Sequence, residues 1–247
     1  MTDNQLAVAR KHLDYQMDRF GFSQPNIRFE KAFIEDLAPA GLADNSVDLV
    51  VSNCVINLAL TKEEVFREVF RVLKPGGELL FADIFADRRI PPAIAHDPLL
   101  RGECLGGAMY FEDFRRILSG MGCRDYRIVT SSPLLLDPKI AQLTGNIKFI
   151  TATVRAFKLD LEDRCEDFGQ VARYLGTLPE APHGFRLDDH HLFETGRYVP
   201  VCGNTAAMLA DSRYGEHFQI VGDRSVHYGL FDCTSPEDAE GTTGACC

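Results

Sequence analysis

Two segments of the chain carry apolar residues at helical spacing. Residues 6–17 place leucine, alanine and methionine every three or four positions, and Gly21 ends the pattern. Residues 61–73 carry a stripe of valines, with Thr61 as a candidate N-cap and Glu64 as the partner that would complete a capping box. Both patterns predict amphipathic helices.

The shorter apolar runs indicate strands. Strands are expected over residues 26–33, 47–52, 78–85, 126–131 and 149–158. The run at 47–52 is almost continuously apolar, which is typical of a strand buried on both faces of a parallel sheet. The tetrapeptide Lys74–Gly77 (KPGG) ends the second helix, and another helix is expected over 111–121. The alternation of strands and helices predicts a parallel sheet covered by helices.

The pattern changes after about residue 159. Short strand-like pieces and glycine-rich turns follow, together with the pairs Asp188-Asp189 and His190-His191, which we interpret as a solvated loop rather than a metal site. The sequence therefore predicts three regions. They are an α/β core over 1–158, a smaller α+β region over 159–233, and a disordered tail over 234–247 that ends in two cysteines.

The net charge and the distribution of apolar residues argue against nucleic-acid and membrane partners. Lysine plus arginine number 26 and aspartate plus glutamate number 36, so the formal charge is −10 and the chain lacks the basic surface of a nucleic-acid-binding protein. No apolar stretch approaches the roughly 20 residues that span a bilayer, and the N-terminal segment has no apolar signal core. We expect a cytoplasmic protein without nucleic-acid or membrane partners, and its oligomeric state stays open.

The chain has eight cysteines, which is many for a protein of a reducing compartment. No CxxC pair is present, so a structural zinc site has little support. Cys123 is interpreted as a packing residue, while the roles of Cys165 and Cys202 stay open. Cys54 differs, because it follows the carboxyl end of the strand at 47–52, where open α/β sheets place their ligands.

Three sequence blocks carry a family resemblance. The order of a strand, a helix ending in KPGG and the strand ELLFAD is similar to the second half of class I methyltransferases. Residues 52–58 (SNCVINL) and 102–108 (GECLGGA) resemble two segments of the arsenite methyltransferases within that class, and the likeness continues through residues 149–158. The resemblance implies an N-terminally incomplete Rossmann-like methyltransferase sheet with a smaller C-terminal α+β region.

The resemblance implies methyl transfer from S-adenosylmethionine to trivalent arsenic, as arsenic detoxification. Cys54 and Cys104 would be the catalytic thiols that hold arsenic, which prefers soft thiolate ligands. The substrates would be arsenite and methylarsenite, and glutathione or thioredoxin would be the thiol reductant. Cys233, Cys246 and Cys247 are hypothesised to capture arsenic on a flexible tail and pass it inward.

The implied cofactor contacts are only partly present in the sequence. The residues that match the family's cofactor-binding positions are Met1, Thr2, Ile34, Glu35, Ser52 and Asn53. The chain has no GxGxG motif, and Met1 matches a position inside the expected fold, so we expect the first strand and its glycine-rich loop to be missing. Two alternatives stay open: a non-catalytic thiol protein that binds arsenic or a metal, and a methyltransferase with a carbon or oxygen acceptor.

Overall fold

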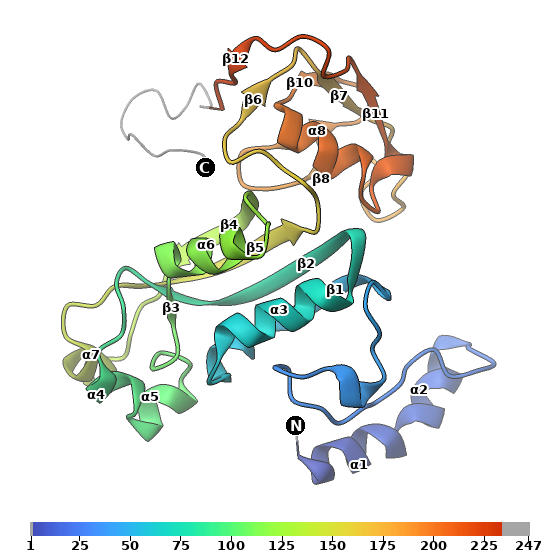
Figure 1. The fold of residues 1–247 in the computed structure, drawn as a ribbon. Coiled ribbons are helices and arrows are strands. Elements are labelled where there is room, and N and C mark those ends of the chain that lie inside the picture. Colours follow the sequence, from blue (N-terminus) through green and yellow to red (C-terminus); the bar gives the residue numbers. More distant parts are fainter. Residues whose placement is uncertain (1, 234–247) are drawn as a thin grey trace.

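The computed structural model describes residues 2–233. Figure 1 shows a central sheet with flanking helices, and a smaller region of short strands around helix α8 at the other end of the molecule. The predicted tail over 234–247 lies outside the described residues. No helix within the described residues is long and apolar enough to cross a membrane.

The N-terminal helical pattern forms two helices, α1 (Asp3–Lys11) and α2 (Leu13–Phe20), and Gly21 ends the second in the left-handed conformation as expected. The strand predicted over 26–33 is wrong. That segment has no sheet partner, and its last residue makes only an isolated bridge with Asp36. Its backbone is bound by side chains instead, as where the guanidinium of Arg10 donates to the Phe29 carbonyl at 2.8 Å.

The central sheet is mixed rather than parallel. Its strands are β1 (Val47–Asn53), β2 (Leu73–Ala86), β5 (Phe149–Phe157) and β4 (Tyr126–Pro133), in that spatial order, and β3 (Met109–Tyr110) pairs with β2. β1 and β3 run parallel to β2, but β5 runs antiparallel to both of its neighbours. The expected Rossmann-like class is confirmed, and the all-parallel sheet is corrected because the last strand inserts in the opposite direction between β2 and β4.

Strand β1 is an edge strand, which contradicts the expected burial on both faces. Within the described residues it pairs with β2 alone. Val51 is 65% exposed, and no residue of β1 is fully buried. The apolar run therefore supplies a strand whose outer edge is open, and only its inner residues reach the core.

Two helices pack on one face of this sheet, α3 (Lys62–Val72) and α6 (Phe111–Gly120). They meet at Phe66 and Phe114, whose ring centroids lie 5.4 Å apart over Phe81 of β2. Both helices were predicted. The predicted capping box of α3 does not form, because the Thr61 hydroxyl donates to the Glu64 carboxylate at 2.9 Å instead of accepting from the backbone.

Short helical segments complete this part of the fold. They are η1 (Ala38–Ala40), η2 (Ile56–Leu58), α4 (Pro92–Ala95), α5 (Pro98–Gly102) and α7 (Pro138–Thr144). The C-terminal region contains α8 (Gly203–Ala210), η3 (Gly215–His217) and the strands β6 (Glu166–Asp167), β7 (Val171–Tyr174), β8 (Gly184–Arg186), β9 (Leu192–Glu194), β10 (Tyr198–Pro200), β11 (Phe218–Val221) and β12 (Gly229–Leu230). A three-stranded antiparallel sheet, β10-β7-β11, is its centre.

The sheet and the C-terminal region are closely joined. Glu78 is fully buried in β2 and accepts from Arg155 at 2.7 Å, from Arg213 at 2.6 Å and from the Tyr214 hydroxyl at 2.9 Å. Phe157 of β5 packs in the C-terminal core. The boundary expected near residue 158 stays a prediction, because a buried ion-pair cluster and a shared core residue both cross it.

Candidate functional site

Cys54 and Cys104 come from segments that are distant in sequence but adjacent in space. Cys54 follows β1, and its N–H continues the ladder by donating to the Ala82 carbonyl at 2.9 Å. Cys104 follows α5, and its sulfur lies 3.8 Å from the Cys54 carbonyl oxygen. Cys54 is exposed and Cys104 is half-buried, so both thiols can be reached by a small solute.

Both cysteines adopt left-handed backbone conformations, with φ of +52° at Cys54 and +62° at Cys104. A side chain other than glycine is disfavoured there by roughly 1–2 kcal/mol. Such strain persists only where the surrounding structure enforces it, and it is concentrated at functional sites. Two strained cysteines side by side therefore mark this position as a candidate site.

Two buried polar residues hold the cysteine segments together. Asp83 of β2 accepts from the backbone N–H of Asn57 at 3.0 Å. The Asn57 side-chain amide donates to the Ile84 carbonyl at 2.7 Å and reaches the Cys104 carbonyl at 3.5 Å. Neither residue was predicted to belong to the site. The signal available was an aspartate inside the apolar strand ELLFAD and an asparagine inside SNCVINL.

The electrostatic environment keeps these thiols protonated. Burial raises the pKa of Cys54, and the negative charge of Asp83 raises it further. The same two causes raise the pKa of Cys104, with a smaller contribution from Cys54 itself. Burial also raises the pKa of Asp83, although backbone N–H donors and the nearby Lys62 oppose the shift. A ligand that leaves the two sulfurs uncharged is favoured here over a pair of free thiolates.

A hollow of about 170 Å³ opens beside Cys54. The neighbouring ends of β4 and β5 contribute hydroxyl groups to part of its wall. These come from Thr130, Ser131, Ser132, Thr151 and Thr153, and the remaining wall includes Asn53 and Asp83. The hollow is smaller than the roughly 300–1,000 Å³ typical of pockets that enclose a drug-sized ligand. It offers room for a small solute next to the Cys54 thiol.

The residues predicted to bind a cofactor fall into three groups. Ser52 and Asn53 are the last residues of β1 and lead directly into Cys54. Ile34 and Glu35 form a turn closed by the bridge between Phe33 and Asp36.

Ile34 packs against the main core. The negative charges of Glu35 and Asp83 both act on the Lys62 ammonium group. Thr2 instead caps α1, exchanging hydrogen bonds with Gln5. Met1 lies outside the described residues. The cofactor roles of all these residues stay predictions.

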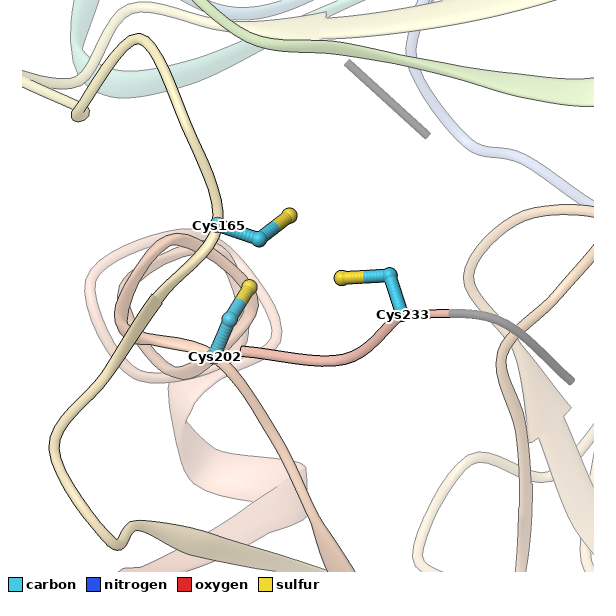
Figure 2. Close-up of side chains that lie close together, drawn as sticks. All are labelled: Cys165, Cys202 and Cys233. Carbon is cyan, nitrogen blue, oxygen red and sulfur yellow. The ribbon is translucent and has the colours of Figure 1, made fainter. Parts of the chain in front are cut away.

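The remaining described cysteines lie elsewhere. Cys123 is buried, with its sulfur 3.4 Å from the Asp125 carbonyl oxygen, as expected of a packing residue. Cys165, Cys202 and Cys233 form a cluster (Figure 2). This cluster was not predicted, and Cys233 was expected on a flexible tail, because the three residues share no short motif. Cys246 and Cys247 lie outside the described residues.

The solvated loop expected at 188–191 is only half correct. Asp189 and His190 are exposed, but Asp188 is 1% exposed. Asp188 accepts from the backbone N–H groups of His190 and His191 and pairs with the His191 ring at 2.8 Å. It also lies 3.6 Å from the buried guanidinium of Arg127. A buried charge needs such partners, so this aspartate stabilises the turn.

Two family models match the chain. Residues 1–130 match a model described as a methyltransferase domain. Residues 169–247 match a model described as the arsenite methyltransferase C-terminal domain. The first match covers β1, β2 and the helices that pack on them, and the second covers most of the C-terminal region.

Similar proteins and a similar structure agree with these matches. An arsenite methyltransferase of Aquipseudomonas alcaligenes is 52% identical over 94% of this chain and 67% of its own length. The human arsenite methyltransferase is 37% identical over 89% of this chain, which spans 58% of that relative. A crystal structure of an arsenic(III) S-adenosylmethionine methyltransferase from Chlamydomonas reinhardtii superposes with a TM-score of 0.89 at 45% identity, covering 94% of this chain and 78% of that one.

Proposed function

This chain belongs to the arsenite methyltransferase family, and from that premise we propose that it methylates trivalent arsenic held by the sulfurs of Cys54 and Cys104. The methyl donor of the family is S-adenosylmethionine. The observation that carries the proposal is the meeting of two strained cysteines at the carboxyl end of β1, where the Cys104 sulfur lies 3.8 Å from the Cys54 carbonyl oxygen.

Arsenite binding at this pair is a ligand exchange. Two S–As bonds form and two As–O bonds break, and each thiol proton leaves with a hydroxide as water. Because the pKa of both thiols is raised, each carries the proton that its leaving hydroxide needs. The bound sulfurs are neutral, which suits the negative charge of Asp83 nearby. Soft thiolate ligands favour trivalent arsenic over the hard divalent cations.

The chain's own residues orient the arsenic for the transfer. When bound, S-adenosylmethionine supplies a methyl group on a positively charged sulfur. The hollow beside Cys54 is too small to enclose that whole molecule, so the described residues account for the arsenic-holding half of the reaction. Two sulfur anchors fix the direction of the arsenic lone pair, and Asn57 and Asp83 fix the two anchors.

A thiol reductant completes the chemistry. Methylation converts the arsenic lone pair into an As–C bond and formally raises arsenic from As(III) to As(V). Return to As(III) needs two electrons, which two thiols supply by forming a disulfide. We assign this role to glutathione or thioredoxin, with arsenite and methylarsenite as substrates. The activity would serve arsenic detoxification in the cytoplasm, where thiols stay reduced.

The test is a methyl-transfer assay with the full chain, arsenite, a thiol reductant and S-adenosylmethionine, with arsenic species separated and identified by mass spectrometry. We expect methylarsenicals from the wild type and none from Cys54→Ser or Cys104→Ser. Cys123→Ser is the matched control, since it removes a thiol outside the site and should retain the wild-type rate. Equal rates in all four proteins would refute the assigned roles of the two cysteines.

A further inference from the structure

Three further cysteines meet in the C-terminal region (Figure 2). The sulfurs of Cys165, Cys202 and Cys233 all lie within 4.8 Å of one another. Cys165 and Cys202 are buried and Cys233 is half-buried, and none of the three is in a disulfide. With sulfur–metal bonds of about 2.3 Å, three sulfurs bound to one ion lie at most about 4 Å from one another, so the three sulfurs would have to move closer by only about 1 Å to bind one.

We propose that Cys165, Cys202 and Cys233 form a second thiol site that holds one trivalent arsenic through three sulfurs. The site shares no residue with the Cys54–Cys104 pair. It goes beyond the proposed function, because it binds arsenic whether or not the first pair supports methyl transfer.

Long-range pairing builds the cluster. β6 and β12 pair antiparallel, and beyond their ends the Phe231 N–H donates to the Cys165 carbonyl at 2.7 Å. This pairing brings the segment containing Cys233 alongside Cys165. Cys202 arrives from a third segment as the N-cap of α8. The arrangement belongs to the fold of the region and requires no rearrangement of the chain.

Two neighbouring residues contact the Cys202 sulfur. The Thr205 N–H donates to its sulfur at 3.4 Å, as expected of an N-cap side chain, and Arg127 lies 4.0 Å away. These contacts hold the Cys202 sulfur in place within the cluster.

The number of ligands favours trivalent arsenic over zinc. Structural zinc is almost always held by four protein ligands, whereas trivalent arsenic forms three bonds and keeps a lone pair. Within residues 2–233, the group of ligand atoms at this position consists of three sulfurs.

The local charge favours the same ion. Arg127 already lies 2.8 Å from Asp125 and 3.6 Å from Asp188, so its positive charge is shared by two carboxylates. Three thiolates with zinc would add a net negative charge to this buried position. Three thiolates with trivalent arsenic are neutral and add none, which avoids the cost of burying an unpaired charge.

Arsenite binding at the three cysteines needs neither an oxidant nor a reductant. Three S–As bonds form, three As–O bonds break, and the three thiol protons leave with the three hydroxides as water. Arsenic stays trivalent throughout. An arsenic that already carries one methyl group has only two exchangeable positions, so the site should prefer inorganic arsenite to methylarsenite.

Native mass spectrometry of the full chain tests the site directly. The background protein is the quadruple variant Cys54→Ser, Cys104→Ser, Cys246→Ser and Cys247→Ser, which removes the first pair and the terminal thiols. With arsenite, we expect a gain of one arsenic atom with a loss of three hydrogens and no retained oxygen. This result does not depend on methyl transfer, so its failure is distinguishable from a failure of the proposed function.

Single substitutions in that background locate the bound arsenic. Cys233→Ser changes the most exposed of the three and should leave arsenic held by two sulfurs, with one hydroxide retained and about tenfold or greater weakening of arsenite binding. Cys202→Ser should weaken binding at least as much. Cys123→Ser is the control and should bind as the background does. Circular dichroism checks that each variant is folded. If the buried Cys202→Ser variant does not fold, the arsenite affinity of Cys233→Ser alone decides the test.

Three results would overturn the proposal. The first is no arsenic on the folded background protein. The second is arsenic binding that is unchanged by Cys233→Ser. The third is a purified protein that carries zinc at this cluster and does not exchange it for arsenite.

Discussion

Replacing Gly107 by alanine tests whether the Cys104 loop must lie against Asn57 to complete the arsenic site. A Cβ at position 107 would overlap the backbone carbonyl oxygen of Asn57 and lie 2.9 Å from its carbonyl carbon. Carbon atoms in ordinary contact are about 3.5–4.0 Å apart, so the two segments would have to separate by about 1 Å. That movement carries Cys104 away from Cys54.

The expected effect is larger on function than on stability. Overpacking of this kind destabilises a protein by roughly 1–3 kcal/mol. A displacement of about 1 Å at reacting groups can lower a rate by about 100-fold, because both sulfurs must reach the same atom. We therefore expect Gly107→Ala to stay folded, to bind arsenite more weakly and to lose about 99% of its methyl-transfer rate.

The matched control is Gly102→Ala in the same segment. A Cβ at Gly102 meets nothing within 4 Å, so this substitution adds the same methyl group without displacing the loop. Initial rates of arsenic methylation, arsenite titrations and thermal unfolding of both variants give the comparison. If Gly107→Ala and Gly102→Ala have the same rate and the same arsenite affinity, the loop contact does not position Cys104 and the reasoning fails.

Three further predictions concern charge and backbone. Asp83→Asn should lower the pKa of Cys54, because it removes the negative charge that raises it, so the pH profile of alkylation by iodoacetamide should move to lower pH; an unchanged profile would exclude that charge as a cause. Gly76→Ala should destabilise the fold by about 2–4 kcal/mol in urea unfolding, because φ at this position is +79° and the added Cβ would overlap a backbone carbonyl of the C-terminal region. The control Gly21→Ala has a similar φ of +74° but open space around its Cβ, so it should lose only about 1–2 kcal/mol. Equal losses in the two variants would argue against the contact at Gly76. The pKa of Glu68 is lowered from 4.5 to about 2 by its arginine partner, so its contribution to stability is complete above pH 4.5 and is lost as pH falls toward 2, and Glu68→Gln should remove that part of the acid dependence of the unfolding free energy.

Local sequence patterns determined the main elements of the sheet and its helices. The valine stripe of residues 61–73 and the pattern of 111–121 predicted α3 and α6, because a helix with an apolar face is recognisable from spacing alone. The SNCVINL and GECLGGA blocks marked Cys54 and Cys104, and the fold brings these two side by side. The same two blocks carried the resemblance to the arsenite methyltransferase family, which the comparisons confirm.

Only the tertiary structure decided which strands pair and which polar groups become buried. The segment 26–33 has strand-like residues but gains no partner, and β5 runs antiparallel because its neighbours are fixed by long-range packing. Asp83 lies in β2 and Asn57 follows β1, and their link appears only after these two strands pair.

The three-cysteine cluster shows the same division between sequence and fold. The sequence determined that thiols occur at positions 165, 202 and 233, and no spacing rule connected them. Pairing of β6 with β12, and the start of α8 beside them, decided that their sulfurs meet. Periodicity specifies which face of a segment is apolar, but contacts between distant segments depend on how all the faces pack together.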